Sequence, residues 1–196
     1  MGPVLPNPVT SPMKLRPASF LILGMVRLGI GSGYAIKKVA DVSTRFFWPT
    51  SLAQVYPELG RLEDAGLVSR REDPQGDRER FAYELTEDGE AALLAWMRSS
   101  KEGSTQFRDE GILRLFFADG LPRKDQLALV RRLRTRASEG VTETREEILP
   151  RAEALEHAGV RFPARVARLR VETYASTEQW FAQLESELET SAEGDE

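Results

Sequence analysis

The feature that most constrains the fold is the stretch 49–68, PTSLAQVYPELGRLEDAGLV, which predicts one helix with a defined start and stop. Ser51 followed three residues later by Gln54 fits a capping box, in which each side chain binds the other residue's backbone N–H. Gly66 supplies the left-handed residue that ends many helices. Apolar residues recur at helical spacing and predict the buried face: Leu52, Val55, Leu59 and Leu62. We expect the opposite face to carry Ser51, Gln54, Glu58 and Arg61.

Two residues in the middle of this stretch leave its geometry open. Pro57 removes one backbone hydrogen bond from a helix interior at a cost of about 3 kcal/mol, so we expect the helix to start late or to bend there. Tyr56 lies beside the apolar face, and its ring can point either into the core or outward to a ligand.

The composition excludes several classes of chemistry. The chain has no cysteine and a single histidine, His157, which rules out disulfides, thiol catalysis and clustered Cys/His metal sites. No phosphate-binding loop or pair of carboxylates at catalytic spacing is present, so we expect no enzyme activity, catalytic residue, metal or cofactor. The apolar run Phe20–Val26 is far shorter than the roughly 18 residues of a membrane span. We therefore expect a cytoplasmic protein without membrane contact.

The charge is distributed unevenly along the chain. The formal net charge is −4, but residues 14–80 hold eleven Lys/Arg against eight Asp/Glu, a net charge of +3. Residues 185–196 hold six acids and no base. A mildly basic N-terminal part and an acidic C-terminal end permit nucleic-acid binding by the N-terminal part without requiring it.

The order of predicted elements in the first half indicates a fold. After a proline-rich leader at 1–13, which we expect to be disordered, a buried helix begins at Pro17 and a second helix is capped by Ser32. The helix at 49–68 follows, and then two strand-like runs flank a Pro/Gly-containing tip. Thr86 caps a fourth helix. This is the order of a winged helix-turn-helix domain, in which the third helix enters the DNA major groove.

The second half predicts helices alone. One long helix carries an apolar stripe of Val130, Leu133, Ala137, Val141 and Ile148, and Pro150 interrupts it. A last helix from Phe162 carries Val166, Leu169, Trp180, Leu184 and Leu188. Two such helices make a thin core that a second copy of the chain would cover, so we infer a homodimer. The predicted class is mainly α, with a leader at 1–13, a winged domain at 14–100, a helical dimerisation domain at 101–190 and a frayed acidic tail at 191–196.

Four tracts resemble the PadR family of transcriptional regulators over residues 17 to about 190: FLILGMVRLGIGSGYAIKK, QVYPELGRLEDAGLV, RFAYELTEDGEAAL and RDEGILRLFFADGLP. The resemblance implies a homodimeric, nucleoid-associated repressor that binds double-stranded operator DNA. Such a protein controls a stress, efflux or detoxification gene, and a small aromatic or lipophilic effector relieves the repression. The hairpin tip PQGDRER departs from a purely basic wing because acids alternate with its arginines.

The predicted winged helix-turn-helix fold and the resemblance to PadR regulators together indicate which residues contact DNA. On the third helix, Ser51 and Gln54 fit a cap and a base contact equally, since Gln can pair with adenine in the major groove. Lys37 and Lys38 on the second helix fit either a solvated face or a phosphate contact, and Asp41 is placed to pair with Lys37. The complete set is Lys37, Lys38, Ser51, Gln54, Tyr56, Arg61, Arg70, Arg71, Arg78 and Arg80.

The aromatic residues are the candidates for an effector site, although most aromatics in proteins are core residues. We expect core positions for Phe46, Phe47, Trp48, Trp96, Phe107, Phe116, Phe117 and Trp180. Trp96 and Trp180 are the two that we assign to effector binding. The alternative function is a protein-interaction module that keeps the winged helix without DNA binding, which the acidic balance and the mixed charges of the wing favour.

Overall fold

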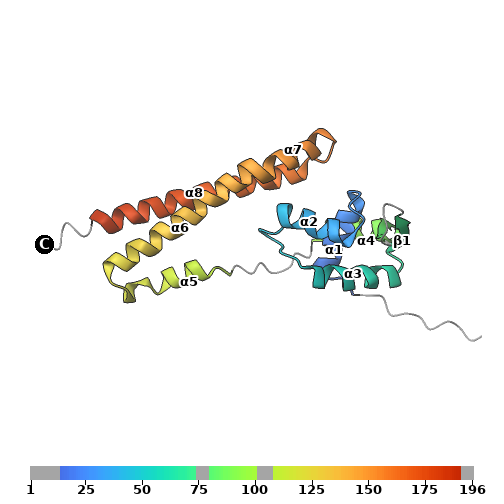
Figure 1. The fold of residues 1–196 in the computed structure, drawn as a ribbon, viewed down its shortest axis with the longest axis horizontal. Coiled ribbons are helices and arrows are strands. Elements are labelled where there is room, and N and C mark those ends of the chain that lie inside the picture. The colour runs from blue at the N-terminus through green and yellow to red at the C-terminus, as the bar shows by residue number, and fades with distance from the viewer. Residues whose placement is uncertain (1–13, 74–79, 101–107, 191–196) are drawn as a thin grey trace, which may run out of the picture. The chain divides into compact units, whose positions relative to one another are not determined.

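The chain divides into two compact units, residues 1–102 and 103–196 (Figure 1). The structure is a computed structural model that describes residues 14–73, 80–100 and 108–190. The leader at 1–13, the hairpin tip with Arg78, Phe107 and the tail at 191–196 lie outside the described residues. Within the described ranges, no helix combines the length and apolar character that crossing a membrane demands.

The first unit has the order of elements that the sequence predicts. Three helices, α1 (Pro17–Arg27), α2 (Gly33–Ser43) and α3 (Leu52–Asp64), precede an antiparallel hairpin of β1 (Val68–Asp73) and β2 (Arg80–Leu85). Helix α4 (Glu87–Arg98) follows the hairpin. The mainly helical winged arrangement predicted for this half is confirmed.

One core holds the first unit together. Helices α1, α2 and α3 each bury one apolar face, and the side chains at its centre are at most 1% exposed: Ile22, Leu23, Ile36, Ala40, Val55, Leu59 and Leu62. Burial of each large aliphatic side chain stabilises the fold by about 1.5–3 kcal/mol. The buried face of α3 therefore fixes which residues of this helix point outward.

The predicted helix ends are confirmed at three positions. Ser32 Oγ accepts a hydrogen bond from the Ala35 N–H at 3.2 Å, and Thr86 Oγ1 accepts one from the Gly89 N–H at 3.0 Å. Gly66 has a φ of 70°, the left-handed conformation that favours glycine. Of the late start or bend expected at Pro57, the late start is wrong, because α3 begins at Leu52 and continues through Pro57 to Asp64.

The second unit is helical throughout its described residues. It contains α5 (Glu110–Phe116), a short 3₁₀ turn η1 (Ala118–Gly120), α6 (Arg123–Glu143), a π-helical turn η2 (Thr144–Ile148), α7 (Leu149–His157) and α8 (Phe162–Thr190). Helices α6 and α8 lie side by side and antiparallel (Figure 1). Ion pairs join Arg131 to Glu185 at 2.6 Å and Arg170 to Glu143 at 2.8 Å.

Pro150 does not end the long helix, contrary to the expectation from the sequence. The chain passes from α6 through η2 into α7, and Pro150 is the second residue of α7. In the π turn the Leu149 N–H donates to the Thr144 carbonyl, five residues back. This shift of the hydrogen-bond ladder lets the helix continue into a residue that has no N–H to donate.

Helix α8 packs only partly through the predicted stripe, because Leu184 and Leu188 lie against the core of the second unit but Leu169 and Trp180 do not. The buried residues on its inner face are Ala164, Ala167, Arg170 and Phe181, whereas Leu169 and Trp180 are 60% and 51% exposed. The small alanines allow the neighbouring helix to approach closely, so they occupy the side that faces the rest of the unit. Leu169 and Trp180 are left on an outer side of the same helix.

Candidate nucleic-acid interface

The outward face of α3 begins at a capping box. Gln54 Oε1 accepts a hydrogen bond from the Ser51 backbone N–H at 3.0 Å, as the sequence predicts. Ser51, Gln54 and Tyr56 are all exposed, and Tyr56 is 54% exposed. The cap therefore does not bury the side chains that form it, and the first turns of α3 present hydroxyl, amide and phenol groups to solvent.

Glu58 is buried, which corrects the expectation that it shares this outer face. Its carboxylate accepts a short hydrogen bond from Ser19 Oγ, and it binds Arg61 Nη1 at 2.6 Å. Glu58 and Ser19 are 7% and 0% exposed. Buried charges need such partners because desolvation is costly. Arg61, a predicted phosphate contact, is thus held on the side of α3 by a carboxylate.

Helix α2 places its first turn beneath Tyr56. A Cβ atom added to Gly33 would lie 2.7 Å from Tyr56 Cε1, so only glycine allows the ring this close. Lys37 forms the predicted ion pair with Asp41, and Lys38 is exposed. The contact between Gly33 and Tyr56 brings the predicted residues of α2 and α3 onto neighbouring surfaces.

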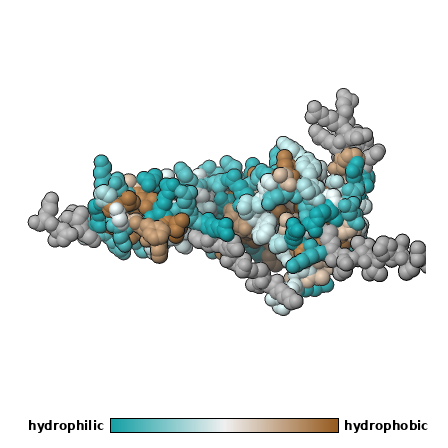
Figure 2. Space-filling view, turned by 90° about the horizontal axis from the view of Figure 1, so that it is seen from below, coloured by the Kyte–Doolittle hydropathy of each residue, from teal (hydrophilic) through white to brown (hydrophobic). Residues whose placement is uncertain are grey.

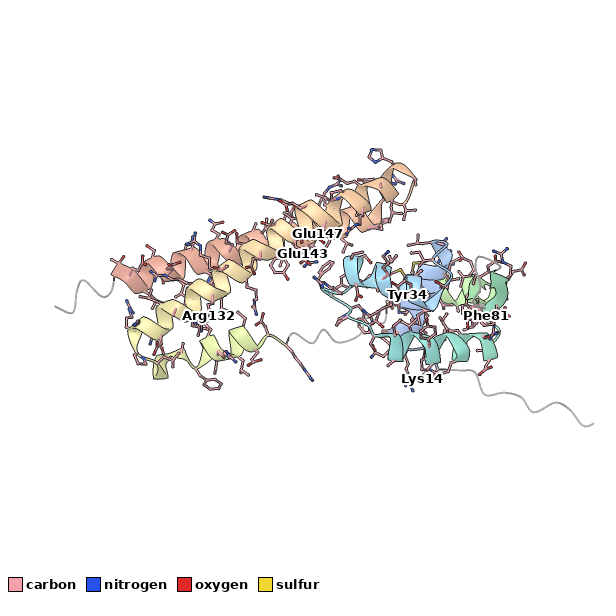
Figure 3. The ribbon with its side chains drawn as sticks, viewed as in Figure 1. Lys14, Tyr34, Phe81, Arg132, Glu143 and Glu147 are labelled. Carbon is pink, nitrogen blue, oxygen red and sulfur yellow. The ribbon has the colours of Figure 1, made fainter. Side chains whose placement is uncertain are left out.

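The arginines of the hairpin are engaged in two different ways. The guanidinium of Arg70 lies over the ring of Phe81, 3.2 Å from its centroid (Figure 3 labels Phe81 on β2). Arg71 forms an exposed ion pair with Glu84 at 3.2 Å. Arg80 is the first residue of β2, and its side chain is outside the described residues.

Backbone contacts fix the hairpin to the helices. The Tyr83 N–H donates to the Gly31 carbonyl at 2.7 Å, between α1 and α2. Thr86 Oγ1 donates to the Gly66 carbonyl at 2.7 Å, just after α3. Burial raises the pKa of Tyr83 above its usual value, and the Glu63 carboxylate acts in the same direction. The base of the wing is therefore held against the turns that flank α2 and α3.

Residues 22–95 match the Transcriptional regulator PadR-like family. The chain carries a PadR-like domain. The match contains α2, α3, the hairpin and nearly all of α4, so it covers the exposed face described above. The family and the relatives named below are transcriptional regulators rather than enzymes.

A relative and two solved structures extend the comparison. The negative transcriptional regulator PadR of Bacillus subtilis is 32% identical over 112 residues, which cover 57% of this chain and 62% of that protein. The crystal structure of B. subtilis PadR in complex with operator DNA gives a TM-score of 0.75 at 22% identity, over 88% of this chain and 99% of that one. The same protein in complex with p-coumaric acid gives 0.67 at 20% identity, over 90% and 99%. These structures share the fold of this chain.

The two tryptophans assigned to effector binding have different surroundings. Trp96 of the first unit stacks on Phe20 with ring centroids 4.6 Å apart and an interplanar angle of 5°. Trp180 belongs to the second unit, where it lines an open groove of about 640 Å³. The groove is lined by Ile112, Glu172, Thr173, Ser176, Thr177, Trp180 and Phe181. Within the described residues, no cluster of three acids or histidines could hold a metal ion.

Six aromatic residues that the sequence predicts as core residues are exposed instead. Phe47, Trp48, Trp96, Phe116, Phe117 and Trp180 are between 39% and 77% exposed. Tyr34 of the PadR-like domain, which the sequence analysis missed, is 66% exposed on α2 (Figure 3). Its exposure could have been predicted from helical periodicity. Tyr34 precedes the buried Ile36 by two residues, and this spacing places it on the opposite side of α2.

Proposed function

We propose that this chain is a sequence-specific DNA-binding regulator, and that the first turns of α3 read the major groove. The observation that carries the proposal is the exposed set Ser51, Gln54 and Tyr56 on a helix whose other face is locked into the core. Helices that read DNA in winged and helix-turn-helix proteins enter the groove with their N-terminal residues at the base edges. The operator complex of B. subtilis PadR, which has the same fold, supports this assignment.

The charged residues around α3 supply phosphate contacts in this proposal. Lys38 on α2 and Arg70 on β1 are exposed, and neither is paired with an acid in the ion pairs described above. Lys37, Arg61 and Arg71 exchange their present carboxylate partners for phosphates when DNA binds. Arg78 and Arg80 complete the contact from the wing. Such contacts give most of the affinity that does not depend on sequence.

We further propose a homodimer built through the second unit. A hydrophobic region gathers on this unit over α5 (Figure 2), where Leu113, Phe116 and Phe117 are 58%, 77% and 67% exposed. Leu169 and Trp180 add apolar surface on α8. A second copy covers these side chains, and the dimer presents two α3 helices to major grooves about 34 Å apart. We assign residues 14–100 to DNA binding and 101–190 to dimerisation.

The regulator in this proposal is a cytoplasmic, nucleoid-associated repressor of a stress, efflux or detoxification gene. A small aromatic or lipophilic effector binds in the second unit near Trp180 or beside Trp96. It lowers DNA affinity by favouring a dimer with a different spacing of the two α3 helices. The structure of B. subtilis PadR with p-coumaric acid supports an effector of this kind.

The variant Gln54→Glu separates a DNA contact from a cap. Glutamate keeps the capping box, so we expect the free energy of unfolding to change by less than about 0.5 kcal/mol. It cannot donate to adenine N7, so affinity for a duplex from the protein's own promoter falls by about tenfold or more. Gln179→Glu, which adds the same charge to an exposed position of α8, leaves the affinity unchanged. If the wild type and Gln54→Glu bind the duplex with equal affinity, Gln54 does not contact DNA and the assignment of α3 to the interface is wrong.

A protein-interaction module without DNA binding is the second candidate. The observation that favours it is that three predicted contacts, Lys37, Arg61 and Arg71, already bind carboxylates. Binding to a generic duplex across a salt series distinguishes the two functions. A regulator loses affinity steeply, with a slope of about −0.9 per phosphate contacted. A module that binds only protein has no affinity for the duplex even at low salt.

A further inference from the structure

A short aromatic turn joins α2 to α3, and it exposes apolar side chains next to the proposed reading face. Phe47 and Trp48 are 54% and 39% exposed, and Leu52, the first residue of α3, is 39% exposed. None of the three belongs to the core cluster of the first unit. Exposed apolar area costs about 25 cal/mol per Å² relative to burial, so these side chains gain from a partner.

Hydrogen bonds hold the backbone of the turn in one conformation. The Phe47 and Trp48 N–H groups both donate to the Thr44 carbonyl, at 3.0 and 2.7 Å. The rings of Phe46 and Phe47 pack edge to face, with centroids 4.7 Å apart and an interplanar angle of 81°. The aromatic side chains are thus presented from an ordered turn, which limits the entropy that a partner must remove.

The chemistry of the segment fits DNA as that partner. Residues 42–57 contain no Asp or Glu and one arginine, Arg45, so nothing in the sequence of this segment repels phosphates. Exposed polar groups, including Ser51 and Gln54, alternate with the apolar ones. The major groove has the same mixture, because it presents hydrogen-bonding edges together with one apolar group, the C5-methyl of thymine.

We propose that Phe47 and Trp48 read thymine methyl groups at the end of the half-site bound by the N-terminus of α3. This inference rests on the proposed DNA-binding function and adds a source of base specificity to it. Leu52 adds exposed apolar surface at the first turn of α3. Gln54 pairs with an adenine, and the aromatic turn contacts the methyl of a thymine in the same or the adjacent base pair. The preferred half-site therefore has A·T pairs at this end.

The test changes the DNA rather than the protein. The probe is a 30-base-pair duplex, a length of about three helical turns, selected by the full-length wild-type protein from a random pool. Each thymine is replaced in turn by deoxyuridine, which lacks only the methyl group. We expect one or two positions in each half-site to lose about fourfold in affinity, the equivalent of one buried methyl group at ~0.8 kcal/mol. If no single replacement changes the affinity, the proposal is wrong.

Protein variants then assign the effect to the turn. Phe47→Ser or Trp48→Ser should bind the thymine and deoxyuridine duplexes equally at the sensitive position, because the group that contacts the methyl is gone. Phe162→Ser, which removes a 72% exposed aromatic from the second unit, keeps the wild-type ratio. A variant that merely loosens the fold lowers both affinities together and leaves their ratio unchanged, which contradicts the proposal.

Two outcomes separate this inference from the proposed function. If the wild-type protein selects no duplex, the DNA-binding function itself fails. If it selects one but the turn variants keep the wild-type ratio, only the thymine contact fails. A change in the oligomeric mass of Phe47→Ser or Trp48→Ser with an unchanged ratio would make the turn a contact between protein copies instead.

Discussion

Replacing Glu58 by alanine tests how α3 is held against α1. The side chain of Glu58 is 9% exposed and accepts from Ser19, which is fully buried. A hydrogen bond to a buried charged group contributes about 1.5–3 kcal/mol. The pair with Arg61 adds little, because the side chain of Arg61 is 37% exposed and is screened by solvent. We therefore expect Glu58→Ala to lower the free energy of unfolding of the first unit by about 2 kcal/mol.

The measurement must resolve the two units of the chain. Hydrogen exchange of the full-length protein, read on peptides from α1 and α3, reports the stability of the first unit alone. A loss of about 2 kcal/mol corresponds to a fall of roughly 10 °C in the melting temperature of a unit of this size. Asp64→Ala is the control on the same helix, since Asp64 is exposed at its C-terminal end and should change stability by less than about 0.5 kcal/mol. Equal exchange in the two variants would refute the buried network.

Two further predictions concern other contacts. Burial raises the pKa of Asp109, but hydrogen bonds from Arg136 and from the amides that open α5 outweigh it and hold this pKa below its usual value. The stability that Asp109 contributes is therefore present above about pH 4 and is lost as the pH falls through its lowered pKa. Hydrogen exchange of α5 across this range should show the loss, and Asp109→Ala should remove it at a cost of about 1 kcal/mol. Gly89→Ala should destabilise the first unit by more than about 2 kcal/mol in thermal unfolding, because its Cβ would lie 1.9 Å from the Leu67 carbonyl oxygen; a melting temperature equal to wild type would contradict this packing.

The order of elements and the helix ends in the first unit could be predicted from local sequence. Caps at Ser32 and Thr86 and the left-handed Gly66 depend on residues within one helical turn, which the sequence places together. The hairpin and the burial of Val55, Leu59 and Leu62 follow from periodicity for the same reason, whereas Leu52, predicted on the same face, is 39% exposed. The predicted DNA-contacting residues on α2, α3 and β1 are partly or fully exposed on one unit.

The remaining features depend on contacts that are distant in sequence. Glu58 is a surface residue by type, and the buried partner that accompanies its burial, Ser19, lies 39 positions earlier. Pro150 reads as a helix break, and the π turn that accommodates it has no local signal. On α8, the exposure of Leu169 and Trp180 depends on where α6 and α7 pack rather than on the sequence of α8 itself. Exposure of Phe47 and Trp48 is equally invisible to composition, because aromatic residues are usually buried.

The central claim is that the N-terminal turns of α3 lie against DNA. The most direct measurement is photo-crosslinking from Ala53, an exposed residue of α3 between Ser51 and Gln54, after Ala53→p-benzoylphenylalanine. Ala154→p-benzoylphenylalanine, at an exposed position of α7, is the control. Irradiation with a labelled duplex from the protein's own promoter should attach DNA to position 53 and leave position 154 free. Equal labelling of the two positions, or none at position 53 when the duplex is bound, would contradict the account.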